Sequence, residues 1–154
     1  MGRMSEIRFY HLQRKPLETA LPEILEKALI RHYRAVVILG DDEKVETINQ
    51  ALWTYAAESF LPHGSAENGF AAEQPVYLTA LDENPNKANL LILAGGGASE
   101  NIDAYDLCCE IFDGNDDDAV IAARARWAAY KDQGHTLIYF QQDDDGRWQQ
   151  KATA

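Results

Sequence analysis

Hydrophobic residues in this chain follow two patterns: short unbroken runs, and longer stretches in which they recur every three or four positions. The unbroken runs AVVIL, within residues 34–39, and NLLILA, at 89–94, are typical of strands buried on both faces of a parallel sheet. Further predicted strands cover residues 7–12, 75–80, 106–112 and 135–141. The helical pattern covers residues 17–33, 42–56 and 119–133.

The predicted ends of the helices depend on proline, aspartate and glycine. Pro16 can open the first helix, but Pro22 lies inside its apolar stripe, where a proline removes a backbone hydrogen bond. We therefore expect this helix to begin near Pro22 rather than at Leu17. The acidic pair at 41–42 caps the second helix, and Gly134 ends the last one.

Strands and helices alternate along the chain, which predicts an α/β protein. The expected architecture is a three-layer α/β/α sandwich on a mainly parallel sheet, because crossover helices cover the faces of such sheets. Residues 143–146 (DDDG) predict a turn that brings the chain back along the last strand as a hairpin. We find no internal repeat and no linker, and we interpret residues 1–154 as a single domain.

The stretch NQALWTYAAESFLPHG, at residues 49–64, combines the end of a helix with an apolar loop. Trp53 projects about 110° from the centre of the buried stripe of that helix. The stripe consists of Val45, Ile48, Leu52, Tyr55 and Ala56. An aromatic residue off the core face, followed by Phe60, Leu61 and Pro62, predicts a docking surface. The alternative is that Trp53 covers a neighbouring loop and Phe60 fills the core.

The last helix carries a second candidate surface. Arg124, Trp127 and Lys131 share one face by their spacing, and Arg126 and Tyr130 share a neighbouring face. Cations beside an aromatic side chain suit the carboxyl end of an acidic, partly apolar peptide. The alternative is that Trp127 and Tyr130 pack on the sheet while the basic residues are solvated and pair with the aspartates at 116–118.

The overall charge limits the classes of partner. The chain has 154 residues with 25 acidic and 14 basic side chains, a formal charge of −11, so we expect no direct nucleic-acid binding. No run of eighteen apolar residues and no signal peptide is present, and we expect a cytoplasmic protein without membrane contact. Cys108 and Cys109 are adjacent, so on a strand they point to opposite faces and stay reduced.

Nothing in the sequence predicts a catalytic site, a metal site or a cofactor. The loop at 13–16 lacks the glycines of a dinucleotide site, and the glycines at 95–97 lack the Lys-Ser/Thr of a phosphate-binding loop. The four histidines are scattered without zinc spacing, and the acidic runs lack calcium spacing. An alternative to a protein that only docks its partners is a nucleotide- or phosphate-binding enzyme. Its ligand would bind at the carboxyl edge of the sheet, near Gly40, Gly95 and Asp113.

The segment ALWTYAAESFLPHG resembles the central motif of the chi subunit of bacterial DNA polymerase III holoenzyme, which has the pattern ALW…AESF.PH. The resemblance extends to FYHL in the first strand, DEK in the second helix, and RxRWxAYK before Gly134. It implies a Rossmann-like fold and a non-catalytic accessory subunit of the clamp loader in DNA replication. It also implies a bridge from the psi subunit to the acidic tail of single-stranded DNA-binding protein.

The same resemblance assigns residues to the two surfaces. Those implied to bind the tail are Arg124, Arg126, Trp127, Tyr130 and Lys131. Those implied to face the psi subunit, or an alternative helicase-like partner, are Trp53, Phe60, Leu61 and Pro62. The sequence departs from the family at Val120 and Ala128, where the best-known members carry lysines, so a weaker or less salt-sensitive tail site is expected.

Overall fold

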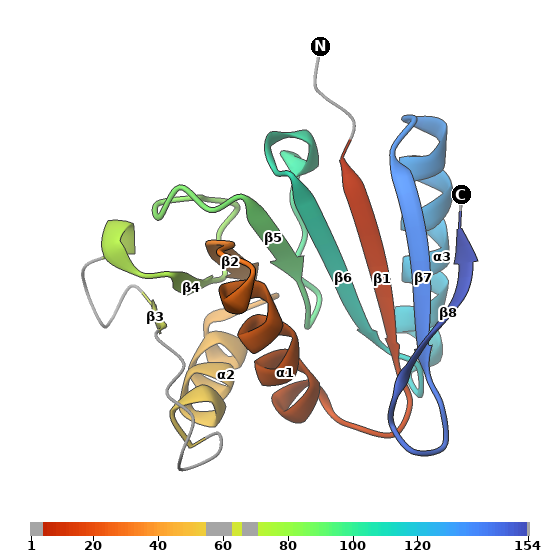
Figure 1. Cartoon of the computed structure of the whole chain (residues 1–154), viewed down its shortest axis with the longest axis horizontal. Coiled ribbons are helices and arrows are strands. Elements are labelled where there is room, and N and C mark those ends of the chain that lie inside the picture. The colour runs from red at the N-terminus through yellow and green to blue at the C-terminus, as the bar shows by residue number, and fades with distance from the viewer. Residues whose placement is uncertain (1–4, 55–62, 66–70, 154) are drawn as a thin grey trace.

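The computed structural model describes residues 5–54, 63–65 and 71–153, which form one mixed sheet with helices on both faces (Figure 1). In chain order the elements are β1 (Glu6–Leu12), α1 (Leu17–Ile30), β2 (Ala35–Ile38), α2 (Asp42–Thr54), β3 (Gly64–Ser65), the 3-10 turn η2 (Ala71–Glu73), β4 (Val76–Thr79), β5 (Leu90–Leu93), the 3-10 turn η3 (Ile102–Ala104), β6 (Leu107–Asp113), α3 (Asp117–Asp132), β7 (Thr136–Gln142) and β8 (Trp148–Thr153). The strand order is β3-β4-β2-β5-β6-β1-β7-β8. Neighbouring strands are parallel except for the antiparallel pair β7 and β8.

The sheet separates two hydrophobic clusters, which confirms the predicted three-layer α/β/α sandwich. Helices α1 and α2 pack on one face, where Leu21, Leu25 and Ile48 meet the sheet, and α3 packs on the other face through Ala123 and Tyr130. Figure 1 shows α1 and α2 in front of the sheet and α3 behind it. Every residue of β2 and β5 is buried, as their unbroken apolar runs predict.

The two adjacent cysteines lie on opposite faces of β6, as predicted. Cys108 belongs to the cluster under α3 and Cys109 to the cluster under α1 and α2, and both are free thiols. Burial raises the pKa of Cys109 to about 12, and it also raises the pKa of Cys108. Both are therefore inert core side chains at neutral pH.

The start of α1 differs from the prediction. The helix begins at Leu17 and runs through Pro22, and the carbonyl of Pro16 accepts the N–H groups of Thr19 and Ala20 at 3.1 and 3.0 Å. Pro22 leaves one carbonyl of the preceding turn without its helical donor. Complete burial of Ala20 and Leu21 offsets that loss, since these side chains reach the core only when this turn is helical.

The segment between α2 and β4 also differs. The hydrophobic pattern predicts no strand or helix between residues 64 and 74, yet Gly64–Ser65 forms the short parallel edge strand β3 against β4, and Ala71–Glu73 is one 3-10 turn. At the other edge of the sheet the predicted hairpin is confirmed, with β8 antiparallel to β7. Among the described residues, none of the helices is long and apolar enough to cross a membrane.

Candidate functional site

Helix α3 begins at the carboxyl edge of the sheet and carries the predicted peptide-binding residues. The Asp116 side chain caps it by accepting the N–H groups of Asp118 and Ala119 at 3.0 and 3.3 Å. Ala123 and Tyr130 are buried against the sheet, while Ile121 on the opposite face is 63% exposed. The helix therefore presents two flanks between its buried and its exposed face.

The outer flank faces β7 and holds Arg124, Trp127 and Lys131, as their spacing predicts. Arg124 and Lys131 are exposed, whereas Trp127 is half-buried with its ring centroid 5.3 Å from that of Phe9 and 6.1 Å from that of Tyr139. Both aromatic contacts are edge-on, so Trp127 is anchored to the sheet beside two exposed cations. We call Arg124, Trp127, Lys131 and Tyr139 the outer flank site.

The charge of Arg124 reaches two residues of the sheet. Burial lowers the pKa of His11, and the nearby charge of Arg124 lowers it further. Burial raises the pKa of Tyr139, and Arg124 partly opposes that rise. His11 Nδ1 is hydrogen-bonded to the Tyr139 hydroxyl. His11 is therefore neutral at pH 7, and Arg124 is the cationic group of this part of the surface.

The inner flank holds Arg126 and Tyr130, which both bind Glu110 on β6. Arg126 Nε and the Tyr130 hydroxyl donate to the same oxygen, Glu110 Oε2, at 2.8 and 2.7 Å. Glu110 is only 2% exposed. Burial raises its pKa, and the charge of Arg126 together with the two hydrogen bonds partly offsets the rise. Arg126 and Tyr130 are thus tied to the sheet.

The five predicted tail-binding residues therefore fall into two groups. At about 100° per residue, Arg124 and Arg126 point to opposite flanks of one helix. The alternative in which the aromatic residues pack on the sheet is confirmed, since Trp127 and Tyr130 both contact Phe9. Its other half holds only in part: Arg124 and Lys131 are exposed to solvent, as it expected, but Arg126 pairs with Glu110 rather than with the aspartates at 116–118.

Trp53 occupies the last turn of α2 and is 51% exposed. Its ring centroid lies 4.5 Å from that of His63, at an interplanar angle of 49°. Val45, Ile48 and Leu52 are buried on the other side of the helix, which confirms that Trp53 lies off the core stripe. The other residues of this predicted surface, Phe60, Leu61 and Pro62, fall outside the described residues, as do Tyr55 and Ala56 of the predicted buried stripe.

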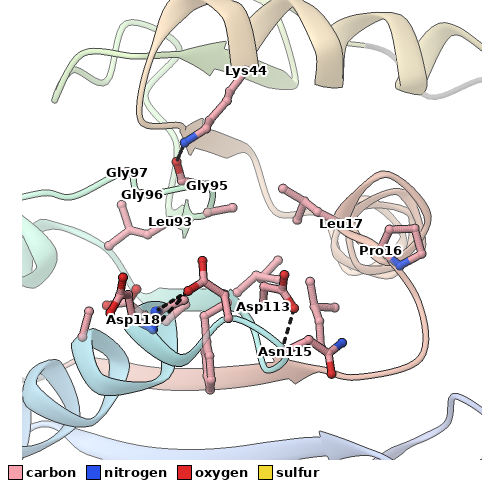
Figure 2. A pocket seen from close by; sticks show the side chains of 18 of the residues that line it. Pro16, Leu17, Lys44, Leu93, Gly95, Gly96, Gly97, Asp113, Asn115 and Asp118 are labelled. Atoms are coloured by element: carbon pink, nitrogen blue, oxygen red, sulfur yellow. Dashed lines mark hydrogen bonds between the residues drawn. The ribbon is translucent and has the colours of Figure 1, made fainter.

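A cleft of about 820 Å³ opens at the carboxyl ends of β1, β5 and β6 (Figure 2). It lies where β1 leads to α1 on one face and β6 leads to α3 on the other, the place where α/β sheets bind ligands. Figure 2 shows Lys44 and Gly95 on one side of this cleft and Asp113 and Asp118 on the other. Glu110 and Arg126 also line it.

The loop after β1 has no free backbone donors for a phosphate. The N–H groups of Gln13, Arg14 and Lys15 all point to Gln142 Oε1, at 2.9, 2.8 and 3.2 Å. Gln142 ends β7 and is 3% exposed, and Asp144 in the following turn binds Arg14 at 2.7 Å. The β7–β8 hairpin thus fills the position in which a dinucleotide-binding protein holds its phosphate.

The glycines at 95–97 form a turn after β5, and backbone geometry explains why these positions are glycine. Gly95 and Gly96 have φ values of 57° and 88°, a region that favours glycine. A Cβ at Gly97 would lie 2.0 Å from the carbonyl oxygen of Ile38. Among the described residues, no group of three metal-ligating side chains is close enough to hold a metal ion.

A known protein family matches most of this chain. The model of the family described as "DNA polymerase III chi subunit, HolC" matches residues 4–138. The chain belongs to the chi subunit family of DNA polymerase III. It is also 32% identical over 90 residues to a "Probable DNA polymerase III subunit chi" of Rickettsia prowazekii (strain Madrid E). That match covers 58% of this chain and 54% of the relative, so the chain spans about half the length of that relative.

In this chi-family chain, the residues matched by the family include both α2 and α3, whereas β8 lies beyond them. The two positions at which the sequence departs from the resemblance both lie on α3. Val120 is partly buried against the sheet, and Ala128 is exposed. Sequence reasoning missed Glu110, although a single carboxylate within the apolar strand LCCEIF is a signal of a buried partner. It also missed Gln142, for which the sequence carries no local signal.

Proposed function

We propose that this chain is a non-catalytic accessory subunit of the DNA polymerase III clamp loader that bridges the psi subunit to the C-terminal tail of single-stranded DNA-binding protein. The observation that carries the proposal is the outer flank site, where Arg124 and Lys131 are exposed on either side of Trp127. Membership of the chi family supports the replication role. The two partners are those that the resemblance to the chi subunit implies, and the two surfaces support them.

The outer flank site has the chemistry to hold the end of an acidic peptide. Within the described residues, Arg124 and Lys131 form no ion pair with a protein carboxylate, so their charges are available. The guanidinium of Arg124 would bind the terminal carboxylate through charge-assisted hydrogen bonds. Trp127, held by Phe9 and Tyr139, would present a rigid aromatic edge to the apolar side chain at the peptide end.

Arg126 and Tyr130 contribute to the proposed tail site indirectly. Both side chains are committed to Glu110, which is nearly inaccessible. Their bonds fix the rotation of α3 on the sheet, and that rotation places Arg124 and Trp127 on the outer flank. We therefore assign them as positioning residues for the tail rather than as residues that contact it.

The second proposed surface centres on Trp53 and docks the psi subunit or a helicase-like partner. Half-exposed tryptophans in contact with a second ring are frequent anchors of protein interfaces. In the family resemblance, Phe60, Leu61 and Pro62 belong to the same surface. The two surfaces lie on helices at opposite faces of the sheet, so one chain can bind both partners at once.

The proposed mechanism is a tether. Coated single-stranded DNA displays many copies of the tail, so a weak individual contact raises the local concentration of the polymerase assembly. Because the contact depends on exposed charges, it weakens as salt screens them. Val120 and Ala128 stand where the family resemblance implies lysines, so α3 carries two fewer positive charges. This limits both the affinity for the tail and the salt dependence of that affinity.

Calorimetric titration of the full chain with an acidic peptide ending in Asp-Ile-Pro-Phe tests this function. We expect a dissociation constant on the order of micromolar that weakens with added salt and is lost when the peptide is amidated. The matched variants are Arg124→Ala, which should abolish binding, and Arg31→Ala, which removes an exposed arginine beside α1 on the other face. Equal binding of the free and the amidated peptide would contradict the proposal.

A further inference from the structure

Strand β8 lies next to the outer flank site and has no role in the function proposed above. The neighbouring strand β7 contacts α3 on one face and pairs with β8 along its outer edge (Figure 1). Trp127 on the outer flank of α3 contacts Tyr139 of β7, so β8 is the next strand beyond that site. Because β8 lies beyond the residues that the family model matches, the family resemblance assigns it no part in binding.

The segments on both sides of β7 carry positive charge without a partner. The chain has a formal charge of −11, yet residues 119–142 contain one acidic side chain, Asp132, and no acidic side chain follows Asp145. These segments form most of α3, β7 and β8. This end of the molecule therefore has positive charge available for a ligand. Four of its exposed cations form no ion pair within the described part of the chain: Arg124, Lys131, Arg147 and Lys151.

A β-bulge brings Lys151 to the level of the outer flank site. Phe140 of β7 pairs with Gln150 of β8. The adjacent residue of β7, Tyr139, pairs with Ala152, which leaves Lys151 as an extra residue of β8. In such a bulge, two residues of one strand oppose a single residue of the other. Lys151 and Ala152 therefore both lie opposite Tyr139, which is a member of the outer flank site.

The charge of Lys151 is more available than that of Arg147. The N–H of Arg147 donates to Asp143 Oδ1 at 2.9 Å and lowers the pKa of that carboxyl, and the charge of Arg147 lowers it further. Arg147 thus lies beside an acidic group of its own hairpin. Lys151 has no carboxylate partner among the described residues and is exposed. Lys151 is therefore the cation of β8 that an anionic ligand can engage at least cost.

The arrangement of these cations suits an extended acidic peptide. Arg124 and Lys131 are two helical turns apart, about 10 Å along the axis of α3, and Lys151 lies on a separate strand. A compact anion such as phosphate would meet one of these cations at a time. An extended peptide presents a side chain about every 3.3 Å and can reach several. The net charge of the chain disfavours a long polyphosphate such as nucleic acid.

An extended peptide held at the outer flank site can reach β8 with few residues. Tyr139 already belongs to that site, and neighbouring strands lie about 4.8 Å apart. Two or three residues before the peptide end, at about 3.3 Å each, cover the distance from β7 to β8. An acidic side chain at one of these positions would meet the ammonium group of Lys151.

We propose that the acidic residues just before the end of the tail bind Lys151, so that the tail site continues from the outer flank site across β7 to the bulge of β8. The inference rests on the proposed function, because it adds a contact for the same ligand. Arg124 and Trp127 still hold the end of the tail. Lys151 supplies, from a neighbouring strand, part of the positive charge that α3 lacks at Val120 and Ala128.

Calorimetric titration of the full chain at low salt, with two peptides of equal length, tests this contact. Asp-Asp-Asp-Asp-Ile-Pro-Phe carries the acidic residues before the end, and Ser-Ser-Ser-Asp-Ile-Pro-Phe lacks them. We expect Lys151→Gln to weaken binding of the acidic peptide by about threefold, the value of one exposed ion pair, and to leave the serine peptide unchanged. Lys27→Gln is the matched control, because it removes an exposed lysine of α1 on the other face of the sheet.

The outcomes separate this contact from the proposed function. If both peptides bind and Lys151→Gln weakens neither or weakens both equally, the contact with β8 is overturned while the outer flank site stands. An equal effect of Lys27→Gln on the acidic peptide also overturns it. Absence of binding by both peptides contradicts the proposed function and this contact together. Titration with oligothymidylate completes the test, since binding that Lys151→Gln weakens would assign β8 to nucleic acid instead of the tail.

Discussion

Arg126 donates from Nε to Oε2 of Glu110 across 2.8 Å and thereby ties the middle of α3 to the centre of β6. The Tyr130 hydroxyl binds the same oxygen at 2.7 Å. Two arginines separated by one residue thus have different roles, because Arg126 is held against the sheet while Arg124 stays exposed. The distinction between an inward and an outward arginine underlies the predictions on α3.

Removal of the Glu110 carboxylate should destabilise the protein. In Glu110→Ala, the partly buried guanidinium of Arg126 and the buried hydroxyl of Tyr130 lose their acceptor, so we expect the free energy of unfolding to fall by about 2–4 kcal/mol. Urea denaturation measures the change. Asp132→Ala, at the exposed end of α3, is the control and should change the free energy by less than about 0.5 kcal/mol. A similar loss in both variants would contradict the role of Glu110.

The raised pKa of Glu110 predicts a pH dependence of stability. Because the folded protein holds the Glu110 proton more tightly than the unfolded chain, this group favours folding below its ordinary pKa of 4.5, and the benefit is lost as pH rises through the higher pKa of the folded state. The stability of the protein relative to Glu110→Gln should therefore decrease with rising pH above 4.5. Urea midpoints measured for both proteins across this range test the sign, and a constant or increasing difference would contradict it.

Trp53 should matter for binding and little for stability. It is 51% exposed, so Trp53→Ala should lower the free energy of unfolding by less than about 1 kcal/mol. If it anchors the partner subunit, the same change should weaken that complex by more than about 2 kcal/mol. Calorimetry with the purified partner measures the loss. Ile30→Ala, which truncates a 76% exposed residue of α1, should leave the affinity unchanged.

Gln142 should be more important to stability than its neighbours in the hairpin. Its Oε1 accepts three consecutive N–H groups at 2.8–3.2 Å, and Gln142→Ala leaves all three without this acceptor. We expect a loss of about 2–3 kcal/mol, since three part-buried hydrogen bonds are lost at about 1 kcal/mol each. Urea denaturation of Gln150→Ala, an exposed residue of β8, provides the comparison. Equal stability of the two variants would show that the three bonds contribute little.

Features set by local periodicity could be predicted from the sequence. The two fully buried strands follow from unbroken apolar runs, and the exposure of Trp53 follows from its angle to Val45, Ile48 and Leu52. The outer flank of α3 follows from the spacing of Arg124, Trp127 and Lys131. In each case residues close in sequence determine the result.

Features set by contacts between distant segments could not be predicted. Pro22 is tolerated within α1 because the sheet buries Ala20 and Leu21, which the local rule for proline does not include. The inward direction of Arg126 depends on Glu110, which is sixteen positions away in the chain. The loop after β1 is filled by Gln142 from the other end of the protein.

The most direct test compares Arg124→Ala with Arg126→Ala in tail-peptide titration and urea denaturation. The account predicts that Arg124→Ala loses tail binding by at least about tenfold with little change in the free energy of unfolding. It predicts that Arg126→Ala lowers the free energy of unfolding by about 2–4 kcal/mol and largely retains tail binding while it is folded. Unchanged affinity in Arg124→Ala, or loss of binding in folded Arg126→Ala alone, would contradict the assignment of the tail site to the outer flank.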